Sequence, residues 1–328
     1  MHSHYDKNTM DIYIHSICKN KMNNIMKQTP MENVQELRDA AWFGLEKQKR
    51  STGWLILLDI ISPSMSALGV GIENKCRAYE SLNKQGTHIN SPEILLSPLT
   101  HDKVHKQISK DVLRIECEVK GVDTSKSYIR AMAIFSKRYP VISYVQGMCD
   151  IFKLFMDVHS ISHDTHVAEA LSYFCFEKIV SKYLDYFSSR QVGIERSIEE
   201  IEELLQKNRP KLFLHLQKSS VEVKYFAYNW MSTFLIREFL HHKEVFDAHF
   251  SLGPAEFIRF NVSFATALVI YLQETLMSSD FEGILYTLQR INEIEWSTME
   301  IQRVLSVSYI IYSGGSLYED LNKINKPQ

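Results

Sequence analysis

The sequence predicts an all-α protein with ten or more helices. Glycine and proline are scarce, at 12 and 8 of 328 residues, which argues against a β-sandwich with many tight turns. Helix start signals recur along the chain instead, and no run of residues alternates convincingly between polar and apolar side chains. An apolar fraction of 45% with 23% charged residues supplies enough material for a folded core.

Apolar residues at helical spacing follow several start signals, each with a side chain that can cap the first amides of a helix. The signals at Thr29 and Ser297 are interpreted as capping boxes, in which serine or threonine is followed three residues later by glutamate. Pro140 would end one helix, and Pro210 would interrupt a short acidic one. The apolar stretches 225–240 and 255–277 also have a helical period. The signals are Thr29-Pro30-Met31-Glu32, Asp123 or Thr124, Asp164 or Thr165, Ser197-Ile198-Glu199-Glu200, Asp280 and Ser297-Thr298-Met299-Glu300.

The chain is expected to form one domain with a short segment at each end. Residues 1–28 are rich in lysine, asparagine and histidine and predict a flexible N-terminal arm. Residues 30–312 contain no linker-like gap, which leaves 313–328 as a C-terminal tail. No internal repeat of about 30–45 residues is visible, which argues against an α-solenoid.

Charge and cysteine content favour a cytoplasmic protein. The formal net charge of −2 gives no general attraction to nucleic acid or to anionic membranes. No apolar run approaches the roughly 20 residues that span a bilayer, and no secretory signal or prenylation box is visible. The cysteines are odd in number and form no C-x-x-C pair, which indicates reduced thiols rather than disulfides or a zinc site. They are Cys18, Cys76, Cys117, Cys149 and Cys175.

Histidines are the first candidates for chemistry. His159, His163 and His166 would share one face if they lay on a single helix, as metal ligands could. Serines, an aspartate and a threonine around them favour a polar connector between two helices over a metallohydrolase site. His241 and His242 are adjacent, so they cannot both face one ion from a helix, and a solvated turn is the better interpretation.

Common catalytic motifs are absent from the sequence. It contains no G-x-S-x-G nucleophile elbow, no G-x-x-x-x-G-K-[ST] phosphate loop and no G-x-G-x-x-G dinucleotide fingerprint. Cys149 lies near Tyr144 and could formally act as a nucleophile, but a small buried thiol is the simpler interpretation. The chain therefore has no recognisable nucleotide-binding or hydrolase site of its own.

Two short segments have unusual polar content. ISKDVLR at 108–114 places Asp111 three residues before Arg114, so the two would be neighbours on a helical turn. This spacing also fits an ordinary solvated ion pair. YVQG at 144–147 places Gln146 in an apolar run, where a buried amide is costly unless it is hydrogen-bonded. Gly147 follows it with unusual backbone freedom.

Taken in order, these segments resemble the TBC domain, the family of GTPase-activating proteins for Rab GTPases. The family's arginine four residues before a tryptophan is matched by Arg38 and Trp42. Its I-x-x-D-x-x-R motif is matched at Ile108, Asp111 and Arg114, and its Y-x-Q-G-M-x-D motif at Tyr144, Gln146, Gly147, Met148 and Asp150. Residues 75–82 also resemble the family, and 226–239 and 280–291 are similar to the Golgi-associated Gyp-type subgroup.

The resemblance spans residues 30–312 and implies a V-shaped, two-lobed, all-helical domain. It implies a GTPase activator without a substrate site of its own, which places Arg114 and Gln146 in trans in the nucleotide site of a Rab. The partner would be the GTP form of a Rab-family GTPase, with its bound GTP and Mg²⁺ and no cofactor of the activator's own. The expected location is cytoplasmic, with peripheral placement at Golgi or vesicle membranes through that partner.

The resemblance also implies supporting roles. Asp111 would restrain the Arg114 guanidinium or its turn, and Tyr144 would pack to fix the loop. Gly147 would allow a tight turn beside the glutamine, and Asp150 would cap the next helix or bond the amides at its start. Arg38 and Trp42 are interpreted as architectural. Gln146 is expected to be partly exposed in the free protein.

The sequence departs from the family pattern at three places. Ile115 replaces the usual threonine, Cys149 replaces asparagine or serine, and Phe246-Asp247 replaces a Trp-Asp pair. Loss of the threonine hydroxyl removes one hydrogen bond, a cost of about 1 kcal/mol. Two functions therefore remain open, a competent Rab activator and a TBC-fold module that binds a Rab or another partner with weak or no catalysis.

Overall fold

The computed structural model describes residues 34–64, 67–87, 98–115, 118–119, 121–239 and 243–315. The predicted N-terminal arm, the capping box at Thr29, His241 and His242, and most of the predicted tail lie outside these described residues.

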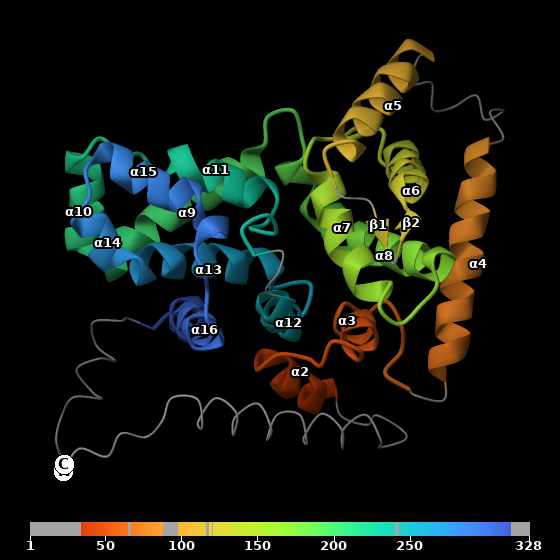
Figure 1. Ribbon diagram of the computed structural model, residues 1–328, viewed down its shortest axis with the longest axis horizontal. Helices are drawn as coiled ribbons and strands as arrows, with labels where there is room; N and C mark the ends of the chain where they lie inside the picture. The colour runs from red at the N-terminus through yellow and green to blue at the C-terminus, as the bar shows by residue number, and fades with distance from the viewer. Residues whose placement is uncertain are drawn as a thin grey trace.

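Within the described residues, fifteen α-helices form two lobes arranged as a V (Figure 1). The all-α, two-lobed prediction is confirmed. The helices of the first lobe are α3 (Arg50–Leu57), α4 (Leu68–Thr87), α5 (Pro98–Val112), α6 (Ser125–Arg138), α7 (Met148–His159) and α8 (Thr165–Val180).

The second lobe follows the 3₁₀ helix η2 (Ser181–Tyr186), which packs against both α8 and the first helix of this lobe. Its helices are α9 (Val192–Asn208), α10 (Pro210–Lys218), α11 (Lys224–Ser232), α13 (Phe257–Tyr271), α14 (Gln273–Met277), α15 (Phe281–Gln289) and α16 (Thr298–Tyr312), with the 3₁₀ turn η3 (Ile291–Glu293) before α16. At the junction of the lobes, α2 (Val34–Trp42) and α12 (Lys243–Ser251) pack on each other and on α3 (Figure 1).

A two-stranded hairpin is a small addition to the predicted all-helical architecture. Strand β1 (Glu118–Val119) pairs antiparallel with β2 (Val122–Asp123), and Gly121 adopts a positive φ of 78° in the connection. Two residues per strand are too few to produce an alternating pattern, so the sequence carries no strand signal here.

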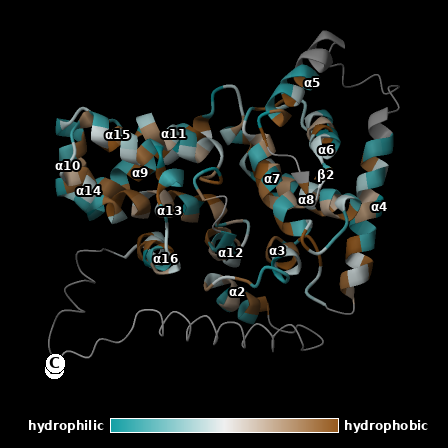
Figure 2. Ribbon diagram, in the orientation of Figure 1, coloured by the Kyte–Doolittle hydropathy of each residue, from teal (hydrophilic) through white to brown (hydrophobic). Residues whose placement is uncertain are grey.

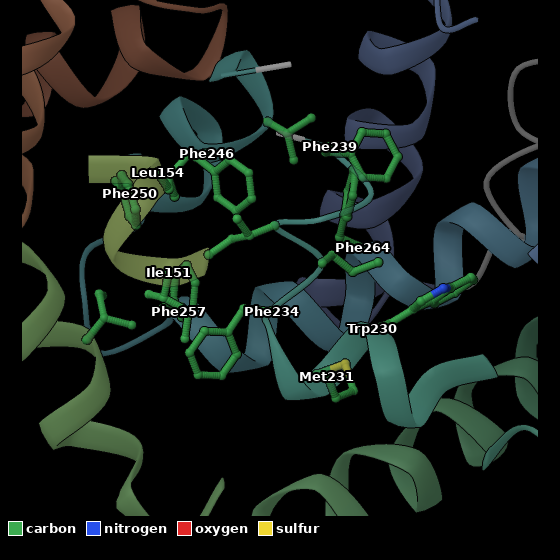
Figure 3. Packing of buried hydrophobic residues seen from close by; sticks show 14 of the residues in the cluster. Ile151, Leu154, Trp230, Met231, Phe234, Phe239, Phe246, Phe250, Phe257 and Phe264 are labelled. Atoms are coloured by element: carbon green, nitrogen blue, oxygen red, sulfur yellow. The ribbon is translucent and has the colours of Figure 1, made fainter. Parts of the chain in front are cut away.

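The apolar core continues from one lobe into the other. Figure 2 shows hydrophobic and hydrophilic residues on most helices, as expected when one face of each is buried. Figure 3 shows Leu154 of α7 close to Phe246 and Phe250 of α12. The Phe250 ring lies 4.8 Å from Trp54 of the first lobe and 5.7 Å from Phe257 of the second, measured between ring centroids. The lobes therefore share one core rather than touching at a thin interface.

Most of the predicted helix starts are confirmed. Asp164 caps α8 by accepting from the Val167 amide, and Asp280 caps α15 by accepting from the Gly283 amide. Ser297 opens α16 with a complete capping box. Thr124 occupies the cap position of α6, but its side chain makes no capping bond.

Three predicted helix boundaries are wrong, and burial explains two of them. Helix α9 begins at Val192 rather than at Ser197, whose hydroxyl is buried against that of Tyr186. Helix α11 ends at Ser232 instead of continuing to 240, because Phe234 and Leu235 are buried with φ of 55° and 63°. The stretch 255–277 divides between α13 and α14 instead of forming a single helix.

Candidate functional site

Arg114 lies in the turn that follows α5. Ile108 and Val112 are buried and anchor the last turns of this helix in the core, and the Arg114 amide donates to the Asp111 carbonyl at 3.0 Å. The Arg114 side chain is 65% exposed. The helix therefore fixes the backbone beneath the guanidinium while the charged group itself reaches solvent.

Asp111 joins the two predicted motifs. One carboxylate oxygen, Oδ2, accepts a 2.8 Å hydrogen bond from the Tyr144 hydroxyl, and the other, Oδ1, lies 3.5 Å from Nη1 of Arg114. Gln107 donates to the same carboxylate from the preceding turn, at 3.2 Å. Because the contact to Arg114 is long, Asp111 orients the guanidinium without holding its donors fully.

Tyr144 connects Asp111 to the start of α7. Its hydroxyl also lies 3.3 Å from the Sγ atom of Cys149, which is buried. Burial raises the pKa of Tyr144 above its usual value, and the neighbouring Cys149 and Asp111 add to the increase. Tyr144 is therefore a neutral hydrogen-bond donor that packs the loop in place. Cys149 serves as its neighbour in the core and is too buried to act as a nucleophile.

Gln146 and Gly147 form the end of the loop that enters α7. Gln146 is exposed, as expected, and makes no side-chain hydrogen bond to any residue that the structure describes. Gly147 precedes the first residue of α7 with φ of 102°, a conformation that disfavours side chains. A Cβ atom here would also lie 3.1 Å from Cγ2 of Thr233. The backbone conformation thus favours glycine, and a side chain here would also crowd Thr233.

Asp150 does not cap a helix, in contrast to one of the two roles expected for it. It lies within the first turn of α7, where its charge suits the helix dipole. Its Oδ2 atom accepts a 2.7 Å charged hydrogen bond from Nη2 of Arg237, in the second lobe. Arg237 stands in the apolar stretch 225–240, where the sequence carries no local signal of its partner.

Arg38 and Trp42 connect α2 to neighbouring helices. Nη1 of Arg38 donates to the Ser251 carbonyl at the end of α12, at 2.6 Å. The Trp42 ring makes edge contacts with Phe260 of α13 and Tyr309 of α16, at centroid distances of 5.6 and 5.2 Å. Arg38 thus attaches α2 to α12 at the junction, and Trp42 attaches it to the second lobe. Both lie on a different part of the fold from the loops of Arg114 and Gln146.

Asp247, the acid of the Phe246-Asp247 pair, holds the junction together. Its carboxylate is fully buried and accepts from the Leu45 amide at 2.8 Å, from Nε1 of Trp54 at 2.6 Å and from Arg50 at 3.0 Å. Burial raises the pKa of Asp247 to about 6, against the opposing effect of Arg50. This carboxylate is therefore ionised at neutral pH, and the donors around it compensate its burial.

The three histidines considered as metal ligands have separate roles. His159 is fully buried at the end of α7 rather than in a connector, and its Nδ1 lies 2.8 Å from Oγ of Ser51. Burial lowers its pKa to about 3, so the imidazole is neutral. His163 lies 3.2 Å from the same hydroxyl, whereas His166 faces Glu80 at the surface. No group of potential metal ligands occurs among the described residues.

Comparison with known sequences places the chain in context. A Rab-GTPase-TBC domain family model matches residues 47–277. The GTPase-activating protein gyp1 of Schizosaccharomyces pombe is 24% identical over 314 residues, which cover 88% of this chain and 60% of that protein. TBC1 domain family member 22B of Homo sapiens is 25% identical over 299 residues, covering 84% of this chain and 58% of that protein. The chain thus spans about 60% of the length of these relatives.

Solved structures agree on the fold. The crystal structure of the Ypt/Rab-GAP domain of Gyp1p superposes with a TM-score of 0.79 at 23% identity, covering 90% of this chain and 98% of that one. The crystal structure of the Chlamydomonas flagellar RabGAP TBC domain superposes with a TM-score of 0.60 at 16% identity. Since the family match covers more than half of the sequence and the fold agrees, the chain belongs to the Rab-GTPase-TBC domain family.

Proposed function

We propose that this protein stimulates GTP hydrolysis by a Rab-family GTPase by inserting Arg114 and Gln146 into the partner's nucleotide site. The main support is the geometry around Asp111, which links the two loops through Tyr144 and Arg114 while both functional side chains remain exposed. A cation and an amide presented together from fixed backbones are what hydrolysis in trans requires.

Arg114 suits the charge that develops during phosphoryl transfer. The transition state is loose and spreads negative charge over the transferring group and the leaving oxygen, so catalysis consists mainly of positioning and charge stabilisation. Guanidinium is always charged and offers several donors in one plane, which matches phosphate oxygens better than the ammonium of lysine. The long contact to Asp111 leaves most of these donors available.

Gln146 suits the orientation of the attacking water. Its amide can accept a hydrogen bond from water through the carbonyl oxygen and donate to a phosphate oxygen through the NH₂ group. Gly147 and Tyr144 fix the backbone on both sides of Gln146, which limits the orientations that the amide can take. In this scheme Gln146 replaces a water-positioning group of the GTPase.

The partner in this proposal is the GTP form of a Rab, with its own Mg²⁺, and the activator contributes side chains only. The named relatives support this assignment, since their names describe a GTPase-activating protein and TBC1 domain proteins. We assign the activating domain to residues 30–312. We place the protein in the cytoplasm, with recruitment to Golgi or vesicle membranes through the bound Rab. No helix among the described residues is long and apolar enough to cross a bilayer.

Single-turnover GTP hydrolysis measured over a panel of Rab proteins tests the proposal. We expect stimulation by the parent protein and its loss in Arg114→Ala and Gln146→Ala, because an arginine finger is typically worth about 10³–10⁵ in rate. Arg114→Lys keeps the charge and should recover only a small part. Arg196→Ala is the matched control, since Arg196 pairs with Asp185 at 3.0 Å in the second lobe. Undiminished stimulation by both alanine variants would contradict the mechanism.

A scaffold that binds a Rab without activating it is the second candidate. Ile115, directly after Arg114, packs its aliphatic side chain against the core, where the family usually has a hydroxyl. An unanchored guanidinium would bind the partner yet stabilise the transition state poorly. This candidate predicts capture of GTP-loaded Rab with no rate increase on any member of the panel.

A further inference from the structure

The turn that follows α11 is fixed by burial. Phe234 and Leu235 both adopt a left-handed backbone conformation, with φ of 55° and 63°, which is costly for side chains other than glycine. Their side chains are buried, and the Phe234 ring contacts Phe257 at a centroid distance of 5.3 Å (Figure 3). Packing in the core of the second lobe therefore holds this turn and determines where Thr233 and Arg237, on either side of the two buried residues, are directed.

Thr233 lies against the loop of Gln146, and Arg237 reaches the first turn of the helix that follows it. Arg237 donates to Oδ2 of Asp150 at 2.7 Å, and the methyl group of Thr233 stands 3.1 Å from the position that a Cβ of Gly147 would occupy. Gly147 directly follows Gln146, and Asp150 lies in the first turn of α7. The second lobe thus supports the base of the glutamine loop, although that loop and its helix belong to the first lobe.

Arg237 also lies within the electrostatic field of the acids that organise the site. The hydrogen bond to Asp150 is the main cause of the raised pKa of Arg237, with burial opposing it and the charges of Glu238 and Asp111 adding to it. Asp111 is the same carboxylate that contacts Arg114 and Tyr144. Arg237 therefore contacts the start of α7 directly and feels the charge of Asp111.

The ion pair between Arg237 and Asp150 is not needed to hold the lobes together. Arg237 is 48% exposed, and an ion pair with this much solvent contact contributes little to stability. The junction is secured instead by the buried carboxylate of Asp247 and by the aromatic contacts of Phe250. A bond with little effect on stability, located at the base of Gln146, points to a role in orientation.

We propose that Arg237 is a positioning residue for Gln146, acting through Asp150 to hold the glutamine loop in register with the second lobe. The proposal rests on the proposed function, in which Gln146 orients the attacking water. A displacement of about 1 Å in a catalytic group can lower the reaction rate about 100-fold. A loop anchored on one side only would present the amide over a wider range of orientations.

Arg237→Ala and Asp150→Asn test the proposal, with Arg196→Ala as the control that removes an exposed Arg–Asp pair between α9 and η2. We expect the maximal single-turnover rate at saturating protein to fall about tenfold in both test variants, because positioning acts on the transition state. The half-saturating concentration and the melting temperature should match those of the control. Arg237→Lys should recover part of the rate.

A double-mutant cycle separates positioning from other roles. If Arg237 acts through Gln146, Arg237→Ala has no further effect on the rate once Gln146 is alanine. Equal losses in the Gln146 and Gln146→Ala backgrounds would overturn the proposal. So would a raised half-saturating concentration with an unchanged maximal rate, which would instead identify Arg237 as a direct contact with the GTPase. If the proposed function itself were wrong, Gln146→Ala alone would leave stimulation unchanged. That result distinguishes a wrong function from a wrong role for Arg237.

Amide hydrogen exchange in the free protein provides a measurement that needs no partner. Arg237→Ala removes the contact with Asp150, so amide exchange should become faster in a peptide covering 144–150. Local opening depends on the contacts that hold a segment in place. The same peptide should be unchanged in Arg196→Ala. Unchanged exchange in Arg237→Ala would count against the proposal regardless of the activity.

Discussion

The Tyr144 hydroxyl donates a 2.8 Å hydrogen bond to Asp111, and this bond joins the loop of Gln146 to the helix that presents Arg114. The two residues stand 33 positions apart in the chain. The bond fixes the separation between the exposed groups of Arg114 and Gln146. Tyr144 and Asp111 can therefore affect the site without touching a substrate. The site is therefore organised by hydrogen bonds beneath its surface.

Tyr144→Phe should uncouple the two loops. The substitution keeps the ring and removes one donor from a buried carboxylate, so we expect the free energy of unfolding to fall by about 1 kcal/mol. The stimulated rate of GTP hydrolysis should fall severalfold, which is a larger effect than the loss of stability alone would cause. Denaturant unfolding and single-turnover rates measure the two effects. Tyr271→Phe is the control, since it removes a 3.0 Å bond to Glu300 in the second lobe, and an equal loss of rate there would refute the prediction.

Gly147→Ala should be destabilising for two reasons that can be separated. The positive φ of 102° alone costs about 1 kcal/mol or more for alanine, and the contact with Thr233 adds to it. Gly314 has a positive φ of 81° with open space around its Cβ position. Gly314→Ala therefore measures the backbone cost by itself. Thermal unfolding should show a larger loss for Gly147→Ala, and equal losses would exclude a contribution from Thr233.

Leu113 and Val141 should contribute affinity without contributing rate. They are 86% and 95% exposed, and they lie in the segments that carry Arg114 and Gln146. Exposed apolar side chains beside a docking site gain contact area when a partner binds. Leu113→Ser and Val141→Ser should raise the half-saturating concentration of activator severalfold, with the maximal rate unchanged. Val70→Ser, on α4, is the control, and a similar effect there would contradict the prediction.

Glu238→Gln should increase stability at high pH. Burial raises the pKa of Glu238 to about 7, and one of its carboxylate oxygens has no hydrogen-bond partner. The folded state therefore retains a proton that the unfolded state releases, so the parent loses stability as pH rises from about 4.5 to 7. Denaturant unfolding should show an advantage of about 3 kcal/mol for the variant at pH 8, which disappears below pH 4.5. A constant advantage at all pH values would mean that ionisation is not its cause.

Helix starts and short motifs could be predicted, because they depend on residues that are close together in the sequence. Asp280 and the capping box at Ser297 are local signals, and both helices begin where these residues place them. Arg114 and Gln146 were recognised because each stands in a short motif. The coarse fold followed from helical periodicity and from the order of the motifs.

Contacts between distant segments could not be predicted. Arg237 contacts Asp150 because the turn at Phe234 directs it there. That turn interrupts the helix that the apolar pattern of its segment predicts. Asp247 was noticed only as half of a variant dipeptide, whereas its partners lie nearly 200 residues earlier in the chain. In both cases burial in the folded core outweighs local preference, and a single sequence carries no signal of which distant residues will meet.

The aromatic continuity around Phe250 has a consequence for the energetics of association. Because Trp54 and Phe257 contact the same ring from opposite lobes, a change in the angle of the V would disturb packed aromatic side chains. Under the proposed function, docking would then mainly immobilise exposed side chains such as Arg114 and Gln146. The entropic cost of ordering each side chain is about 0.5–1.5 kcal/mol of binding free energy. Under the proposed function, this shared core would favour a GTPase whose surface fits the existing angle of the V over one that needs the lobes to open or close.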